Sequence, residues 1–408
     1  MIDFIRKKLD SHFSLFIIAL GAGGFLLSNL LLRELLSEED YGKYSILITF
    51  LSMAYLFGLL GFEQVFIRFS NVISKNVIQT QKSQLQIIFL TTFITTSLLT
   101  VAYLIFFQRD NPVNLVLLFP TTYCMVISPI LFNIFRLNSE FSLAQFVSNG
   151  WKLGLALISV GFFLFRKDDL STVYLLIFLT IIGVVILFLI LIKMRIRFSF
   201  NDELNVREAL SAFFLFFLSI FAFSIVMFAD RFIIEGKLGT VVFGDYFYLT
   251  NFVLAPFAML QNYIGFKQVV HFKENFSVSG FKDFNRKILY LSLGLSIILI
   301  LILFTLVKIN VLNFDFFKYR WIIFLLLILG IVRLHSSSIL PAFEVKTNLN
   351  TLKLANLIVI LITVFISLIV IYFVHSLDVI IIGFILIWLT RSLVYRKLLL
   401  RQIEKEIQ

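Results

Sequence analysis

Residues 170–193 read LSTVYLLIFLTIIGVVILFLILIK, a run that carries no charge before its final lysine. About 20 apolar residues are enough for a helix to cross the ~30 Å hydrocarbon core of a bilayer. Runs of this kind recur along the whole chain, which predicts an all-α integral membrane protein of about twelve membrane-spanning helices. We place them near residues 13–36, 43–66, 84–107, 112–137, 142–165, 170–193, 208–231, 241–268, 284–307, 318–342, 351–374 and 377–397.

The composition of the whole chain agrees with this interpretation. Of the 408 residues, 60% are hydrophobic and 14% are charged, whereas a soluble domain carries roughly 25% charged residues. The polar stretches between the apolar runs are short, and such segments do not bury a core of their own. We therefore expect no enzyme, and we expect any substrate to be handled within the helical bundle or at its faces.

The net charge of +11 would suit a partner such as nucleic acid. However, Lys and Arg are spread between the apolar runs rather than gathered on one face or one tail. If the N-terminus is cytoplasmic, the loops on that side hold a roughly twofold excess of Lys and Arg, as the positive-inside rule requires. The pattern therefore predicts that both termini are cytoplasmic, and it predicts no nucleic-acid partner.

Cofactors, metals and a cleaved signal are not expected. The chain contains no GxxxxGK[ST] motif for ATP phosphates. Its single cysteine, Cys124, excludes a disulfide and a CxxC site. Basic residues precede the first apolar run, but that run continues past Leu31 and is too long for a signal peptide.

Two short motifs each occur twice, in the same order. Residues 41–44 read YGKY and follow the first predicted helix, and residues 243–246 read FGDY and follow the seventh. Residues 61–65 read GFEQV at the end of the second helix, and residues 265–269 read GFKQV at the end of the eighth. An interfacial aromatic residue at a helix entry explains one motif but not the matched pair.

The repeat unit is therefore six helices. An even number of spans returns the chain to its starting side, so the halves have the same orientation, as in transporters with parallel repeats. We expect an N-terminal lobe over residues 1–200 and a C-terminal lobe over residues 201–408. We also expect a central cavity between them, with helices 1, 2, 7 and 8 facing it.

Several of these segments carry a family resemblance. The chain resembles the Wzx-type oligosaccharide flippases of polysaccharide biosynthesis, within the multidrug/oligosaccharidyl-lipid/polysaccharide exporter superfamily. The resemblance lies in the small residues Gly21–Gly24, residues 36–44, the pair Asp230-Arg231, and the motif over residues 244–246. The twelve spans fit the same family across the whole chain.

The resemblance implies a function in the bacterial cytoplasmic (inner) membrane. An undecaprenyl-pyrophosphate-linked oligosaccharide would be moved from the cytoplasmic to the outer leaflet by alternating access, two lobes rocking around a cationic cavity. The product would be a surface polysaccharide such as O-antigen of lipopolysaccharide, capsule or exopolysaccharide. Membrane lipid, a polysaccharide polymerase and a chain-length regulator would be partners.

A pyrophosphate needs cations, and arginine holds phosphate through two parallel hydrogen bonds where lysine acts as a point charge. Lys152 and Arg333 lie within predicted spans, where a charge is costly unless it faces a cavity or a partner. We take both as candidate substrate-binding residues, together with Arg33, Arg68 and Lys267 near helix ends. The alternatives are that these residues form structural ion pairs, that their side chains snorkel to the membrane surface, or that they only set the topology of the chain.

A second set of candidates concerns gating and protons. Asp230, Arg231 and Glu63 are candidates for a gate or an ion pair. His335 is a candidate proton site, although a histidine satisfied by a hydroxyl is the alternative. The glycines at residues 21–24 serve either as a bend point or as a surface for close helix packing.

Two other functions remain open. A drug or cation exporter of the same superfamily would need membrane-embedded acids, whereas the deep charges Lys152 and Arg333 are basic. A membrane polysaccharide polymerase would need a large outer loop or a catalytic acidic pair, and the sequence shows neither.

Overall fold

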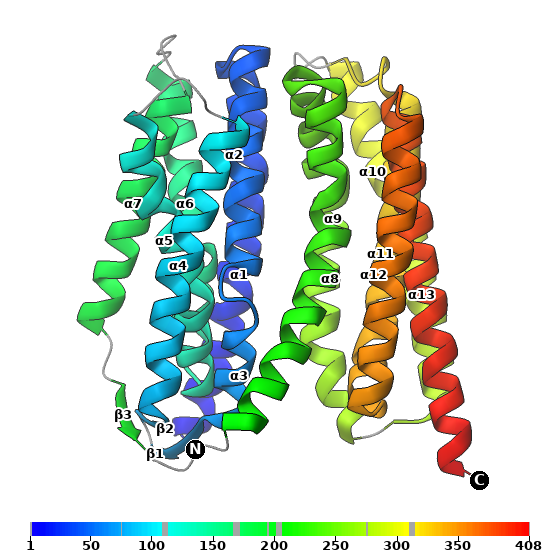
Figure 1. The fold of residues 1–408 in the computed structure, drawn as a ribbon. Coiled ribbons are helices and arrows are strands. Elements are labelled where there is room, and N and C mark those ends of the chain that lie inside the picture. Colours follow the sequence, from blue (N-terminus) through cyan, green and yellow to red (C-terminus); the bar gives the residue numbers. More distant parts are fainter. Residues whose placement is uncertain are drawn as a thin grey trace. The chain divides into compact units, whose positions relative to one another are not determined.

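The computed structural model describes residues 2–74, 76–107, 113–165, 172–193, 196–200, 206–274, 276–309 and 315–407. Nearly all of this chain is helical (Figure 1). In the described residues, twelve helices are long and apolar enough to cross a membrane. The prediction of an all-α, multi-pass membrane protein with twelve spans is confirmed.

The chain forms two compact units, Met1–Ser224 and Ile225–Gln408. The first holds α1 (Ile2–Leu35), α2 (Glu38–Phe57), α3 (Phe62–Phe69), α4 (Lys82–Phe107), α5 (Val113–Leu137), α6 (Phe141–Phe165), α7 (Thr172–Lys193) and the first part of α8 (Val206–Leu238). The second holds the rest of α8, α9 (Thr240–Glu274), α10 (Val278–Ile309), α11 (Arg320–Lys346), α12 (Leu349–Phe373) and α13 (Leu377–Ile407).

The boundary between the units falls inside α8. The first part of this helix packs on the first unit, where the ring of Phe213 stacks on Phe62 at 4.3 Å between centroids. The ring of Phe217 lies tilted against that of Phe57, with centroids 6.0 Å apart. Our lobe boundary at residues 200 and 201, and the cavity between the lobes, stay predictions.

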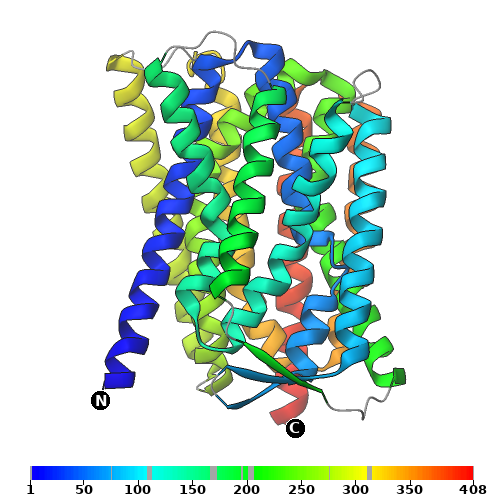
Figure 2. The ribbon, with the colours of Figure 1, turned by 90° about the vertical axis from the view of Figure 1, so that its left-hand side faces the viewer.

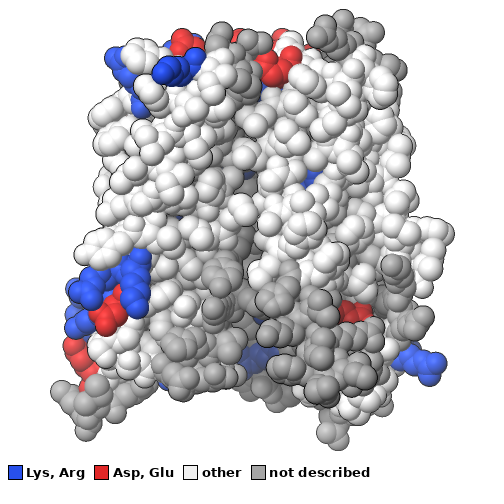
Figure 3. Space-filling view, turned by 180° about the vertical axis from the view of Figure 1, so that it is seen from behind, with Lys and Arg blue, Asp and Glu red and all other residues white. Residues whose placement is uncertain are grey.

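The surface of the helices is apolar between their ends. In the face drawn in Figure 3, charged side chains gather toward the ends of the helices and the band between them is almost entirely uncharged. Large side chains such as Phe106 on α4, Phe188 on α7 and Phe304 on α10 are exposed. An exposed apolar surface of this extent is typical of helices that face lipid.

The second predicted span is interrupted. We predicted one helix over residues 43–66, but α2 ends at Phe57 and α3 begins at Phe62. Leu60 and Gly61 between them have positive φ angles of 53° and 95°. A Cβ on Gly61 would also lie 3.0 Å from the Phe217 nitrogen of α8, so glycine is required by both conformation and space.

The break exposes backbone groups that need partners inside the membrane. The Thr95 hydroxyl of α4 donates to the Gly58 carbonyl at 2.6 Å. Satisfying freed backbone groups by neighbouring side chains is how irregular backbone is tolerated at membrane depth.

A three-stranded sheet lies at one end of the first unit, the end that also carries the N-terminus (Figure 2). Strand β1 (Asn71–Ser74) pairs antiparallel with β2 (Val77–Thr80), which pairs parallel with β3 (Arg197–Phe200). We read these segments as polar loops. The partners β2 and β3 are far apart in sequence, so local patterns do not show their pairing.

The glycines of α1 serve close packing against α6. A Cβ on Gly21 would lie 2.7 Å from the Asn149 Cβ, and one on Gly24 would lie 3.3 Å from the Ala156 Cβ. Phe25 and Trp151 meet edge to face across the same contact, with ring centroids 5.7 Å apart. Small residues let two helices approach closely in a membrane.

Candidate functional site

Three arginines gather inside the second unit in an assembly that we call the arginine cluster. It combines side chains from α8, α9, α11 and α13, which bring together segments that lie far apart in the sequence. Its members are Asp230, Arg231, Tyr246, Arg333, Trp388 and Arg391.

Asp230 is the acid of this cluster and is only 9% exposed. Its Oδ2 accepts a hydrogen bond of 2.6 Å from the hydroxyl of the fully buried Tyr246. Its Oδ1 has no hydrogen bond with any residue that the structure describes. The charges of Arg231 and Arg333 lie close enough to act on this carboxylate.

Two of the arginines share one indole ring. The guanidinium carbons of Arg333 and Arg391 lie 5.1 Å and 5.0 Å from the centre of the Trp388 ring. Arg333 also donates to the Met227 sulfur at 3.1 Å. Cation–π contacts of this kind help to hold both guanidinium groups in place.

The cluster carries more positive than negative charge. It contains three guanidinium groups and one carboxylate within helices that span the membrane. Cations at this depth are costly, and in membrane proteins they often mark sites for anions or for charge transfer. The arrangement therefore fits a doubly charged anion such as a phosphate ester.

Arg391 and Trp388 were not among the residues we selected from sequence. Arg391 is buried, at 5% exposure, and lies near the middle of the span Leu377–Glu404. Its charge within an apolar run was the available signal in the sequence. Its position beside Arg333 follows from the packing of α11 against α13.

Lys152 lies in a polar patch on α6 in the first unit. Its ammonium donates to the Asn149 side chain at 3.0 Å and lies 5.8 Å from the centre of the Trp151 ring. Asn149 in turn donates to the Gln145 side chain at 3.1 Å. No described carboxylate pairs with this lysine, so the ion-pair alternative is not seen in this part of the chain.

Ser148, the residue before Asn149 on α6, contacts α2. Its hydroxyl and that of Tyr55 are 3.0 Å apart and share a hydrogen bond. Trp151 packs on Phe25, as described above, which agrees with a packing role for this ring.

Arg33, in the last turn of α1, has an acidic partner. Its Nη2 lies 3.3 Å from Glu38 Oε1, and its guanidinium lies 5.6 Å from the centre of the Tyr41 ring. The side chain is 13% exposed. These contacts tie α1 to the start of α2, so Arg33 has a structural role whether or not it meets a substrate.

Glu63 and Arg68 lie on different faces of α3. Glu63 is 7% exposed, and its Oε2 has no hydrogen bond within the described residues. Arg68 is exposed to solvent. Lys267 lies in α9, and its side chain lies outside the part of the chain that the structure describes.

His335 lies half-buried on α11, two residues from Arg333. The hydroxyl of Ser338 donates to its backbone carbonyl at 2.7 Å, so this hydroxyl does not satisfy the imidazole. Ser337, which shares a face with Arg333, donates to the Arg333 carbonyl at 2.9 Å. The roles predicted for all these residues stay predictions.

No family model matches the chain, and no curated protein matches it by sequence. Solved structures do match. An outward-facing multidrug resistance MATE family transporter of the MOP superfamily aligns with a TM-score of 0.55 at 13% identity, over 97% of this chain and 95% of that one. An inward-facing MATE family transporter of the same superfamily aligns with a TM-score of 0.55 at 11% identity, over 96% of this chain and 99% of that one.

A third structure, MATE in a bent conformation, aligns with a TM-score of 0.55 at 12% identity, over 97% of this chain and 95% of that one. At these identities the similarity shows the fold. The chain therefore has the twelve-helix fold seen in MATE family transporters of the MOP superfamily.

Proposed function

We propose that this chain is a flippase for undecaprenyl-pyrophosphate-linked oligosaccharides, acting in the bacterial cytoplasmic membrane with both termini in the cytoplasm. The observation that carries the proposal is the arginine cluster, where Arg333 and Arg391 flank Trp388 with one carboxylate nearby. The transporter fold of the whole chain supports transport rather than polymerisation.

The physical task is to move a charged, hydrated head group through ~30 Å of hydrocarbon while its lipid tail stays in the bilayer. Arginine is suited to the charged part because its planar donors match phosphate oxygens in pairs. When the anion binds, the excess positive charge of the cluster is neutralised. Binding therefore offsets part of the free energy that is needed to keep three arginines within the membrane.

Lys152 gives the first unit a cation of its own. It is held by amide side chains rather than by a carboxylate, so its charge is available to an anionic ligand. In alternating access, the head group is bound by these cations in turn as the two lobes change orientation. A polysaccharide polymerase and a chain-length regulator then act on the delivered repeat units.

A drug or cation exporter is the second candidate, because two buried acids are present. Asp230 and Glu63 are 9% and 7% exposed, so the view that the deep charges are all basic does not hold for the folded chain. Asp230, however, is held by Tyr246 among arginines, which disfavours an organic cation there. Glu63 is the acid that this candidate would use.

Flipping is tested with purified protein in vesicles that carry a fluorescent undecaprenyl-pyrophosphate-linked oligosaccharide, read out by quenching the outer leaflet. We expect faster movement of the labelled lipid with the protein than in empty vesicles. Uptake of the cationic dye ethidium is measured alongside. Ethidium transport without lipid movement would overturn the flippase and favour the exporter.

A further inference from the structure

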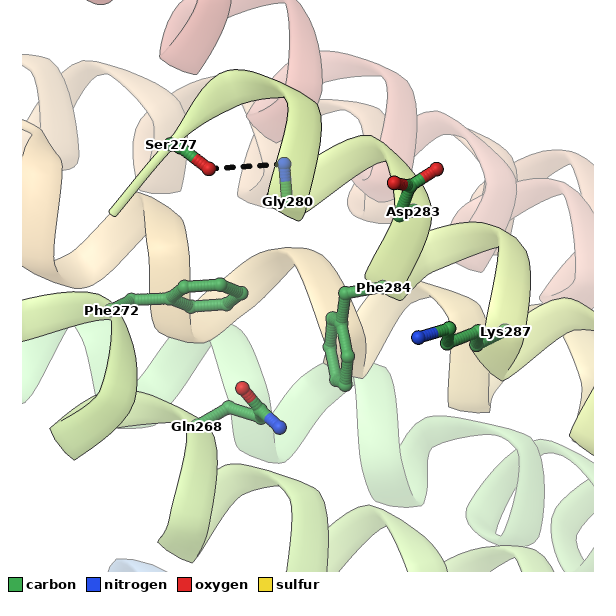
Figure 4. A pocket seen from close by; sticks show the side chains of 7 residues that line it. All are labelled: Gln268, Phe272, Ser277, Gly280, Asp283, Phe284 and Lys287. Carbon is green, nitrogen blue, oxygen red and sulfur yellow. Dashed lines mark hydrogen bonds between the residues drawn. The ribbon is translucent and has the colours of Figure 1, made fainter. Parts of the chain in front are cut away.

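A separate pocket of about 300 Å³ lies in the second unit where α9 ends and α10 begins (Figure 4). Its α9 residues lie beyond the membrane-spanning part of α9, which ends at Gln261, and its α10 residues lie in the first turns of the span Val278–Ile309. Asp283 and Lys287 are exposed, so the rim of the pocket lies at the surface, where a water-soluble group can reach it. The lining residues that matter here are Gln268, Phe272, Ser277, Asp283, Phe284 and Lys287.

Aromatic packing makes the pocket wall rigid. Phe272 contacts Phe276 and Phe284 edge to face, with centroids 5.8 Å and 5.7 Å apart. The Ser277 hydroxyl accepts a hydrogen bond of 3.1 Å from the Gly280 N–H and so anchors the start of α10. A wall of this kind is preformed, which reduces the ordering cost of binding a ligand.

The polar groups of the pocket include both acceptors and donors. Gln268 Oε1 is buried and has no hydrogen bond with any described residue, so it needs a donor. Asp283 at the rim is a further acceptor, held at 3.0 Å by Arg286. Lys287 is a donor, and Figure 4 shows its ammonium beside the Phe284 ring.

We infer that this pocket binds a sugar ring. A neutral sugar offers hydroxyls that both donate and accept, and C–H faces that pack on the exposed part of an aromatic ring such as Phe284, which is half-buried. The lining residues Asp283 and Lys287 carry opposite charges, and Arg286 also pairs with Asp283 at the rim, so inorganic phosphate is the rival ligand that the test includes. The polar lining disfavours an apolar ligand.

The binding of a sugar ring is inferred from the pocket itself. That this sugar belongs to the transported glycan rests on the proposed function. With the predicted topology, the pocket lies on the cytoplasmic side, where a lipid-linked oligosaccharide is loaded. The arginine cluster would then take the phosphates, and the pocket would select the sugar.

The test is saturation-transfer NMR on the detergent-solubilised full-length protein, with glucose, galactose, rhamnose and N-acetylglucosamine as probes and inorganic phosphate as the rival. We expect at least one sugar to bind, and Gln268→Leu to weaken it by about fivefold, the value of one lost hydrogen bond. Phe284→Leu and Lys287→Gln should also weaken it. Lys282→Gln is the matched control, since Lys282 is exposed on the same helix and does not line the pocket.

The inference is overturned if no sugar of the panel binds, if only phosphate binds, or if the pocket variants bind as well as Lys282→Gln. A melting curve of each variant separates lost binding from lost folding. Sugar binding without lipid movement in vesicles would contradict the proposed flippase function and support the sugar-binding pocket. Lipid movement without sugar binding would support the flippase function and contradict the sugar-binding pocket.

Discussion

The two units use the same repeated motifs in different ways. In the first, the buried Tyr41 hydroxyl donates to Asn29 at 3.5 Å. In the second, the buried Tyr246 hydroxyl donates to Asp230 at 2.6 Å. Both contacts tie the start of one helix to the helix before it, but one is neutral and long and the other is charge-assisted and short.

The second pair of motifs differs in backbone. GFEQV begins at a helix break in the first unit, with Gly61 at a φ of 95°. GFKQV lies inside the continuous helix α9. The comparison teaches that the buried aromatic positions of the first motif pair are shared, whereas charge and backbone conformation have diverged. We therefore expect anion binding mainly in the second unit and conformational strain mainly in the first.

The largest effect is expected for Arg333→Ala. Losing one charged partner of a desolvated anion contact costs about 2–5 kcal/mol, so lipid movement in vesicles should fall on the order of 100-fold. Arg333→Lys should recover only part of it, because lysine lacks the paired donors. Arg401→Ala is the control, since Arg401 is exposed on α13 and is not a candidate site residue. Normal transport by Arg333→Ala would show that the arginine cluster takes no part in the mechanism.

Tyr246→Phe tests the charge-assisted bond. The Asp230 carboxylate would lose its one hydrogen bond from a described side chain, and bonds to charged groups contribute about 1.5–3 kcal/mol. Tyr41→Phe should cost less, because its 3.5 Å bond is long and neutral. Thermal unfolding of both variants in one detergent measures the difference. Equal losses of melting temperature would show that the two contacts are equivalent.

Gly61→Ala compares the two backbones. Alanine at a positive φ and 3.0 Å from neighbouring atoms should cost about 1–3 kcal/mol. Gly265→Ala lies within helical backbone, where alanine is favoured over glycine by about 1 kcal/mol. Melting temperatures should therefore move in opposite directions. A shift in the same direction for both would mean that the break is not a fixed feature of the first unit.

A smaller effect on transport than that of Arg333→Ala is expected for Lys152→Gln. Glutamine keeps an amide donor for Asn149 while removing the charge, so the helix contact should survive. We expect lipid movement to slow by about tenfold, equivalent to about 1.4 kcal/mol. Asn149→Asp would sharpen the test, because it supplies a carboxylate partner that no described residue provides for Lys152, and it should also slow transport.

Much of the fold was predictable from sequence. The apolar runs predicted twelve spans close to those observed, such as residues 84–107 for α4 and 142–165 for α6. The repeated motifs predicted two six-helix halves. The candidate cations Lys152 and Arg333 were also visible, because a charge inside an apolar run is conspicuous without any knowledge of packing.

Other features were visible in sequence only as single residues. Arg391 reads as a charge in the last helix, and Trp388 as an aromatic residue one turn before it. At the helix break, the sequence shows only a glycine, Gly61, within an apolar run. The sequences of β2 and β3 indicate polar loops. Nothing local predicts that these residues meet their partners.

The sequence by itself determined that the chain enters the membrane and how many times it crosses, because the bilayer thickness sets the length of an apolar run. The tertiary structure alone decided which charges share a site. Asp230, Arg333 and Arg391 come from three helices, and only the packing of α8, α9, α11 and α13 places them around Trp388 and Tyr246. Contacts of this kind depend on side chains distant in the sequence, which no single stretch encodes.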